Sequence, residues 1–285
     1  MNHRQARRRA GDLLAKALLW CGAGAVAALL LAVAGYVCVR GAAGISWRLL
    51  TEEESVLRGT VGIFPAVVNT LFVIAASLAV VLPLGVGAAV YLTEYARRRW
   101  LVGLVEFAAE VLSGIPSILY AMIGALVFCG RLGLQKTLLA GALTLAVMTL
   151  PTVLRTTQES LKAAPDAYRE GALGLGVGKW PMIRTVVLPA SRDGIVTGCI
   201  LAAGRVVGET AVLMYTAGLS TVMQDFSSPQ GLLHASGATL STVLYVYAKE
   251  RADIGTAFAV ATVLLAVTAV INLAVSAVGR RARRG

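Results

Sequence analysis

Long runs of residues without a single charge constrain this chain more than any other feature of its sequence. Of its 285 residues, 57% are hydrophobic and only 14% are charged, whereas soluble domains carry about 25% charged residues. An α-helix needs about 20 apolar residues to cross a hydrocarbon core about 30 Å thick. Five charge-free runs have about that length, so the sequence predicts an all-α integral membrane protein. They are residues 17–39, 59–93, 111–130, 137–154 and 254–279.

A sixth crossing is predicted for residues 194–218, which are apolar apart from Arg205 and Glu209. Residues 231–248 also lack charge, but they contain His234 and two tyrosines, a composition that suits a helix lying in the membrane interface. A seventh crossing there would also separate the Arg-rich C-terminus from the other basic segments. We therefore expect six spans, with residues 231–248 lying either in the interface or buried in the protein.

The distribution of basic residues predicts the orientation of these spans. Cytoplasmic flanks of membrane helices retain Lys and Arg. With both termini in the cytoplasm, 18 of the 26 Lys and Arg residues fall on the cytoplasmic side. The net charge of +11 is then mainly a sign of topology, and the basic ends call for membrane lipid and no nucleic acid as their partner.

The chain is expected to divide near its second span. Residues 1–60 are predicted to form an N-terminal anchor span and the first extracytoplasmic loop, and residues 61–285 a core with the other five spans. Within the core, the sequence from Gly114 to Ser117 includes Pro116 and is predicted to kink or break the third span, because proline lacks a backbone N–H and clashes with the preceding turn.

A cytoplasmic segment of about residues 157–190 separates the fourth and fifth spans. It is far longer than the connections of about two to eight residues usual between bundle helices, so we expect it to have a structure of its own. Pro165–Asp166 predicts a helix start, with Asp166 as its N-cap, and the glycines from Gly174 onward predict its end. A second helix is expected to begin at Pro181 and to end at Leu188–Pro189, which gives a helix-turn-helix beneath the membrane.

The same segment resembles a known motif. Glu170, Gly171 and Ala172 are followed by Gly176 and then by Leu188–Pro189, a spacing similar to the EAA motif of ABC importer permeases, with Gly171 in place of the motif's second residue, alanine. In that family the loop docks into a groove on a cytoplasmic ATPase. The resemblance implies that these residues couple ATP hydrolysis to movement of the spans.

Other segments are similar to phosphate-importer permeases of the PstA type, and the similarity extends from about residue 60 to the C-terminus. Val212 departs from that family, which has proline there. The resemblance implies a six-helix type I ABC importer permease (MetI-like) fold in the inner membrane. It also implies three partners: a homologous permease of the PstC type, an ATPase homodimer of the PstB type, and an extracytoplasmic phosphate-binding protein of the PstS type. The similar segments are Gly62–Pro65, Leu82–Gly85, Tyr91–Tyr95, Ser113–Ser117 and Gly208–Ala211.

Two charges inside the fifth span point to an anion path. A charge near the middle of a membrane helix costs about 2.5–3.5 kcal/mol on insertion scales, so Arg205 and Glu209 are expected to face the bundle interior or a wet cavity. Their spacing of four residues predicts one helix face, where they either form a purely structural ion pair or leave guanidinium donors for an oxyanion. The resemblance adds Thr210 to this path. Arg155 is either a second path residue or a positive-inside anchor.

The sequence contains no sign of catalysis. It lacks the Gly-x-x-x-x-Gly-Lys-Ser/Thr loop that binds ATP phosphates, and its two histidines form no metal-ligand cluster. We expect a non-enzymatic subunit with no catalytic residue, metal or cofactor of its own, whose partner consumes ATP. Two rival interpretations remain: a permease for another oxyanion or small solute of the sulfate or molybdate class, and an ion-coupled secondary carrier. The carrier is expected to show two similar halves, and no internal repeat is visible.

Overall fold

The computed structural model describes residues 3–54, 60–226 and 228–282, whose regular elements are all helices. Four helices contain apolar stretches long enough to cross a membrane: α1 (His3–Ala42), α3 (Phe64–Val90), α6 (Leu138–Ala163) and α14 (Ile254–Ala282). Two bent pairs raise the number to six if each pair is one span. In the first, α4 (Arg99–Gly114) meets α5 (Ser117–Gly124) at 100°; in the second, residues 179–190 meet α10 (Arg192–Gly208) at 67°.

Short elements connect the long ones. The π-helical turns η1 and η2 extend α3 and α5, and η4 extends α13. The remaining bounds are α2 (Trp47–Thr51), η1 (Tyr91–Tyr95), η2 (Ala125–Arg131), α7 (Asp166–Gly174), α8 (Lys179–Met182), η3 (Ile183–Val187), α9 (Leu188–Ala190), α11 (Ala211–Thr216), α12 (Pro229–His234), α13 (Leu240–Tyr245) and η4 (Val246–Glu250).

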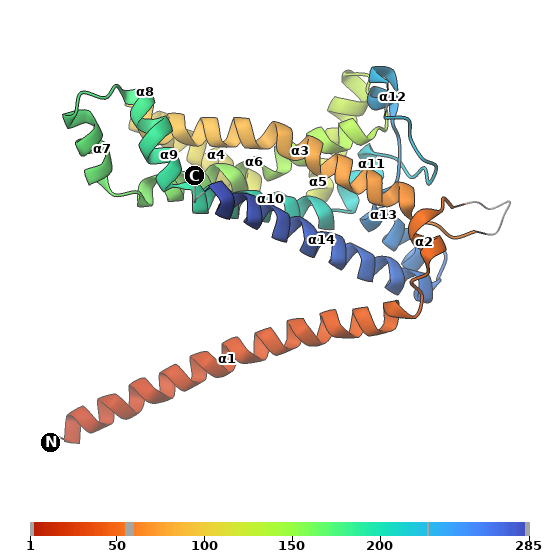
Figure 1. Ribbon diagram of the computed structural model, residues 1–285, viewed down its shortest axis with the longest axis horizontal. Helices are drawn as coiled ribbons and strands as arrows, with labels where there is room; N and C mark the ends of the chain where they lie inside the picture. Colours follow the sequence, from red (N-terminus) through yellow and green to blue (C-terminus); the bar gives the residue numbers. More distant parts are fainter. Residues whose placement is uncertain (1–2, 55–59, 227, 283–285) are drawn as a thin grey trace.

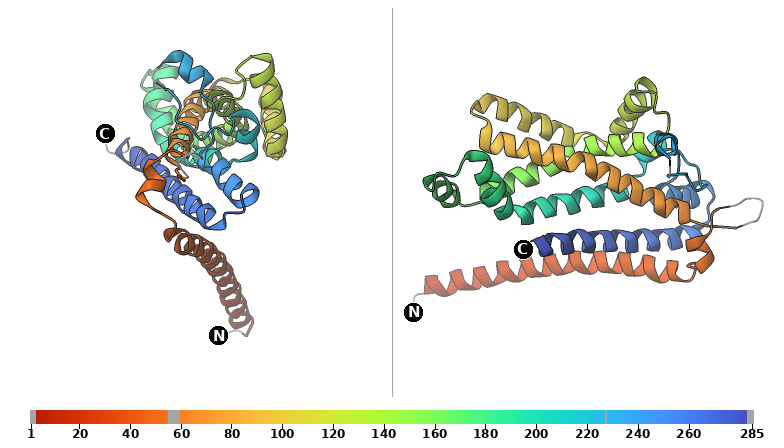
Figure 2. Two further views of the ribbon diagram at one scale, coloured as in Figure 1. Left: turned by 90° about the vertical axis from the view of Figure 1, so that its right-hand side faces the viewer. Right: turned by 45° about the horizontal axis from the view of Figure 1, so that its top comes forward.

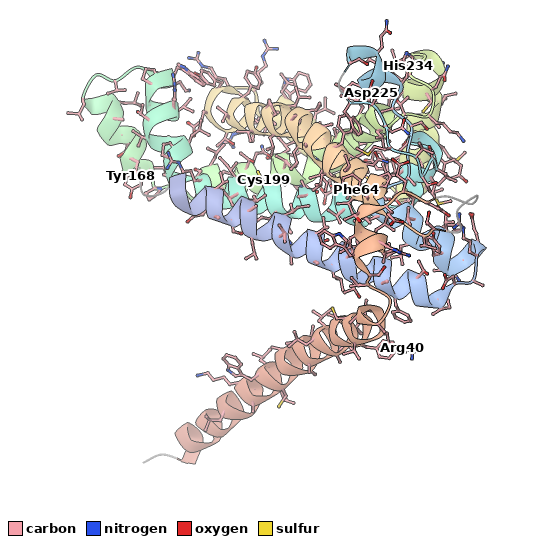
Figure 3. The ribbon with its side chains drawn as sticks, turned by 45° about the vertical axis from the view of Figure 1, so that its right-hand side comes forward. Arg40, Phe64, Tyr168, Cys199, Asp225 and His234 are labelled. Atoms are coloured by element: carbon pink, nitrogen blue, oxygen red, sulfur yellow. The ribbon has the colours of Figure 1, made fainter. Side chains whose placement is uncertain are left out.

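The core of the bundle lies where α3 packs along α6, with α10 against both of them and against α14 (Figures 1 and 2). Its centre consists of fully buried apolar side chains from these helices, including Val73, Leu145, Met148 and Val206. The segment α7–α9 projects from one end of the bundle, which we call the loop end, and α12 lies at the opposite, far end. Figure 3 shows Tyr168 at the loop end and His234 at the far end.

Helix α1 stands apart from this core. Most of its apolar stretch is exposed, and it contacts α14 near its own C-terminal end, where the rings of Tyr36 and Phe258 lie 5.7 Å apart edge to face. Figure 1 shows α1 diverging from the bundle, with its start toward the loop end, where α14 also finishes. This arrangement suits an anchor helix, because a helix in lipid does not need protein neighbours to cover its apolar surface.

The break predicted in the third span is confirmed. Helix α4 ends at Gly114, Ile115 has an extended backbone with a ψ of 130°, and Pro116 precedes α5. The span predicted over residues 111–130 therefore turns by 100° at this break.

Residues 231–248 are not an apolar crossing, as predicted, and of the interfacial and buried placements left open for them the structure favours the buried one. Residues 235–243 are buried in the bundle apart from the half-buried Ser236. Their backbone is paired by side chains of α3: Asn69 donates its amide N–H to the Ala238 carbonyl (3.0 Å), and the Leu240 N–H donates to the Thr70 hydroxyl (2.9 Å). Because these partners satisfy the polar backbone, the segment lies inside the protein.

An ionic cluster closes the far end. Arg251 pairs with Glu54 and lies over the Tyr247 ring, 4.8 Å from its centroid. Burial and the nearby Glu54 carboxylate raise the pKa of Tyr247 to about 12. Asp253 caps α14 by accepting hydrogen bonds from the Thr256 hydroxyl (2.6 Å) and N–H (3.0 Å), which lowers the pKa of Asp253.

Two glycines of α3 test the contact between α3 and α6. A Cβ atom on Gly85 would lie 2.8 Å from Cγ1 of Val153, so Gly85→Leu is expected to force the helices apart at a cost of about 1–3 kcal/mol. Gly87 has open space around it, so Gly87→Leu is the matched control. Thermal unfolding of the purified protein in detergent should show a lower Tm for Gly85→Leu alone. Equal Tm values for the two variants would contradict this packing.

Candidate functional site

The helix-turn-helix predicted at the loop end is confirmed, with two changes at its helix starts. Pro165, not Asp166, occupies the N-cap position of α7, and the Asp166 carboxylate instead pairs with Arg169 at 3.0 Å. The second helix begins at Lys179, two residues before Pro181, because the first turn of a helix tolerates a residue without an N–H. Gly176 makes the turn between the helices with a φ of 78°, a conformation that favours glycine.

The six predicted coupling residues separate into an outer and an inner set. Glu170, Gly171 and Gly176 are exposed, beside Leu175, a residue that is 86% exposed at the tip of the turn. Ala172 is buried against η3, and Leu188–Pro189 are half-buried just before the bend into α10. The loop therefore presents an apolar tip on a packed base, the shape suited to docking against another protein.

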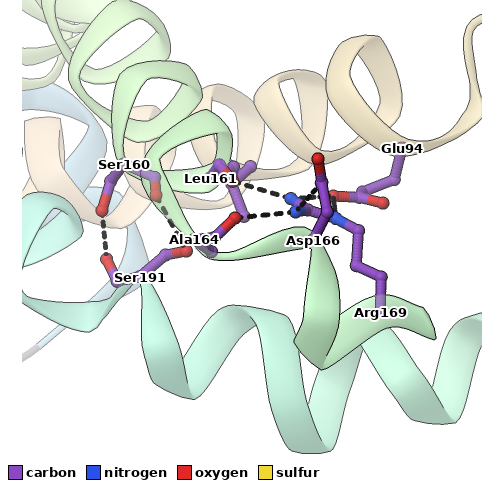
Figure 4. A network of polar contacts seen from close by, with 7 residues as sticks. All are labelled: Glu94, Ser160, Leu161, Ala164, Asp166, Arg169 and Ser191. Atoms are coloured by element: carbon purple, nitrogen blue, oxygen red, sulfur yellow. Dashed lines mark hydrogen bonds and ion pairs between the residues drawn. The ribbon is translucent and has the colours of Figure 1, made fainter. Parts of the chain in front are cut away.

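Sequence reasoning missed Arg169 and Glu94, which hold the base of the loop (Figure 4). Arg169 donates from Nε and Nη2 to Oε1 of Glu94, at 3.1 and 2.9 Å, and both side chains are largely buried. It also donates to the carbonyls of Leu161 (2.7 Å) and Ala164 (2.9 Å) at the end of α6. The available signal was Glu94 itself, the charge that ends a 35-residue apolar run.

The expectation that Arg205 and Glu209 share one helix face is wrong, and the alternative of a structural ion pair between them is not found among the described residues. Helix α10 ends at Gly208, and Glu209 has an extended backbone with φ −80° and ψ 117°. The Glu209 carboxylate accepts a hydrogen bond from the Val212 N–H (3.4 Å) at the start of α11, and its carbonyl accepts one from the Ser241 hydroxyl (2.9 Å). These partners stabilise a break that helical spacing alone does not reveal. Thr210, half-buried, lies at the same break.

Arg205 lies half-buried in the last turn of α10, where a helix dipole favours a cation. Among the residues that the structure describes, no side chain or carbonyl accepts a hydrogen bond from its guanidinium, and none forms an ion pair with it. The buried Tyr120 of α5 lies within electrostatic range of it. Its donors are therefore available to a ligand.

Arg155 is not brought together with Arg205. It is exposed on α6 and pairs with Glu110 of α4 at 3.5 Å, and a second pair, between Lys162 two turns further along α6 and Glu106 of α4, measures 3.1 Å. Its two predicted roles, path residue and anchor, both stay predictions.

Two broken helices meet beside Arg205. Helix α11 packs on α5, so the break at Glu209–Thr210 lies near the bend between α4 and α5. The Tyr120 hydroxyl donates to the Leu112 carbonyl (2.7 Å) across that bend. Non-helical backbone at membrane depth is tolerated only inside protein or beside a wet cavity. This arrangement is typical of transport proteins, in which such breaks form substrate sites.

Comparison with known proteins agrees with this geometry. Residues 81–284 match the family described as "Binding-protein-dependent transport system inner membrane component". The chain belongs to this family. This family consists of inner membrane components of transport systems. The predicted resemblance to the family of permeases with the EAA motif is therefore confirmed. The family description, a component of a binding-protein-dependent system, does not fit an autonomous ion-coupled carrier.

Several relatives in the permease family share about a third of their sequence with this chain. A probable ABC transporter permease, YqgI, of Bacillus subtilis is 34% identical over 77% of this chain and 75% of that protein. Phosphate transport permease PstA 1 of Mycobacterium tuberculosis is 35% identical over 75% of this chain and 68% of that protein. PstA of Haemophilus influenzae is 31% identical over 73% and 72% respectively. The predicted similarity to PstA permeases is confirmed.

Solved importers confirm the MetI-like fold. A bacterial ABC transporter that imports alginate superposes with a TM-score of 0.65 at 17% identity, covering 98% of this chain and 99% of that chain. The MetNI methionine transporter gives 0.58 at 19% identity, over 78% and 94%. The division at residue 60 stays a prediction, since the family match begins inside α3.

The hydroxyl of Tyr120 gives a direct test of the bend in this permease. Tyr120→Phe removes one of two hydrogen bonds to the carbonyl of the half-buried Leu112, which keeps the Ile115 N–H at 3.3 Å, and is expected to cost about 0.5–1.5 kcal/mol and to lower the Tm. Tyr215→Phe, on the exposed face of α11, is the control and should leave the Tm unchanged. If the two variants unfold at the same temperature, the hydroxyl does not stabilise the bend.

Proposed function

We propose that this permease is one of two transmembrane subunits of an ATP-driven importer for inorganic phosphate and forms half of the translocation path. The single observation that carries the proposal is the guanidinium of Arg205, free of protein acceptors in the described structure and placed where two broken helices meet. Identity of 31–35% with PstA permeases supports phosphate as the substrate.

The chemistry of the path follows from Arg205 and its neighbours. A guanidinium stays charged and offers a planar fork that matches two oxygens of a phosphate. Glu209, at the break that follows α10, is proposed to line the path with a carboxylate that weakens the hold on an anion, because a conducting site must bind without trapping. The hydroxyl of Thr210 adds a hydrogen-bond donor to the path. Arg155 is proposed as a further binding position for the anion, closer to the loop end.

The partner proteins in this proposal are inferred from the exposed loop and from the family to which the chain belongs. The exposed tip around Leu175 docks on an ATPase dimer of the PstB type, which consumes ATP, so this chain needs no cofactor. A PstC-type permease completes the path, and a PstS-type binding protein delivers phosphate at the far end. In this proposal the loop end and both termini are cytoplasmic, with Arg-rich segments at the lipid headgroups.

The proposal is tested in membrane vesicles that contain the chain with its partners. Phosphate should stimulate ATP hydrolysis, and Arg205→Gln should lower uptake between about tenfold and about a hundredfold, as expected for a lost charge-assisted contact, with assembly intact. Arg131→Gln, an exposed residue at the end of η2, is the control. Stimulation by sulfate or molybdate in place of phosphate would assign the chain to another oxyanion, and normal uptake by Arg205→Gln would exclude the anion-path role.

The turn of the loop provides a second test. Gly176→Val places a β-branched residue at a φ of 78°, which costs about 1–2 kcal/mol and should reduce phosphate-stimulated ATP hydrolysis about tenfold. Gly174→Ala, in the last turn of α7 and with open space around it, should retain full stimulation. Equal stimulation in the two variants would count against the docking role of this turn.

A further inference from the structure

Two neighbouring residues of η1, Glu94 and Tyr95, contact the two helices of the loop, α7 and α8. Glu94 pairs with Arg169 of α7, and Tyr95 lies beneath the Lys179 ammonium of α8, 4.9 Å from the ring centroid. Since η1 continues α3 without interruption, both helices of the loop are attached to the loop end of the same long helix.

The guanidinium of Arg169 uses all five of its N–H groups. Two donate to Glu94, one to the exposed carboxylate of Asp166, and two to the carbonyls of Leu161 and Ala164. The side chain of Arg169 is 17% exposed and that of Glu94 only 6%. One side chain therefore joins three elements, α3 with η1, α6 and α7, in a largely dry environment where the contacts are strong.

A second attachment lies at the other end of the loop. The Ser160 hydroxyl donates to the Ser191 carbonyl (2.8 Å), and the Ser191 hydroxyl donates to the Ser160 carbonyl (3.2 Å). Gly194 lies directly against Ser160, with no room for a side chain. The bend between α9 and α10 is thus fixed to α6, so the loop has no free pivot at either end.

We propose that Arg169 is the positioning residue of the coupling loop, which locks α7 to α3 and α6 so that a push on the exposed tip moves these helices as one body. The inference rests on the proposed function. Arg169 touches neither substrate nor nucleotide in this role; it keeps the loop from bending on its base. Lysine cannot replace it, because one ammonium with three donors cannot reach Glu94 and both carbonyls in the planar geometry of the fork.

The test uses the whole complex, purified with its partners and reconstituted in liposomes, with inorganic phosphate as the probe. The measured quantity is phosphate transported per ATP hydrolysed by assembled complex. Arg169→Lys should lower this ratio about tenfold or more, as expected when a buried ion pair loses its geometry. Asp166→Asn is the matched control, because the Asp166 side chain is 86% exposed, and should keep the ratio unchanged.

Glu94→Gln is the second variant, which keeps the shape of the side chain and removes its charge. A lowered ratio in assembled complexes of either variant supports the proposal. A smaller yield of complex with an unchanged ratio in both variants would show that the contact serves folding alone and would overturn the proposal. Absence of phosphate uptake by the unaltered complex would instead contradict the proposed function, so the two failures are distinct.

Discussion

Every backbone group that leaves a helix within or next to the membrane needs a partner, and this requirement organises the whole structure. At the bend between α4 and α5 the Tyr120 hydroxyl donates a hydrogen bond to the Leu112 carbonyl, and at the break after α10 the Ser241 hydroxyl donates one to the Glu209 carbonyl. At the loop end Arg169 does the same for the last carbonyls of α6. Each of these three irregular segments is therefore held by a specific side chain.

These partners explain how one chain combines a stiff loop with a polar centre. The broken helices leave the Arg205 guanidinium without a protein acceptor among the described residues, and the chain leaves the helix shortly after it, at Glu209. The loop is joined to the same core through α3 and α6, the helices whose close packing at Gly85 and Val153 forms the middle of the bundle. A displacement of the loop is then passed to the helices that surround the path, because packed interiors resist compression.

The sequence predicted the features that depend on local chemistry. Charge-free runs predicted the spans, Pro116 predicted the bend, and the proline and glycines of the loop predicted its two helices, because each effect acts within one or two turns. Features that depend on distant partners were not predictable. Helical spacing placed Arg205 and Glu209 together, but Ser241, 32 residues away, holds the break that separates them. The composition of residues 231–248 left an interfacial and a buried placement open, and the contacts of Asn69 and Thr70 with the backbone at Ala238 and Leu240 decide for the buried one.

The pair between Arg169 and Glu94 joins residues 75 positions apart, which no local pattern reveals. Its role is tested most directly by the distance between spin labels at Tyr168, exposed on α7, and Arg97, just after η1, in the reconstituted complex with the four native cysteines replaced. The account predicts one narrow distance distribution that is the same without nucleotide and with ATP bound, because loop and helix move together. A distribution that shifts or broadens when ATP binds would show that the loop bends on its base, and the account would be wrong.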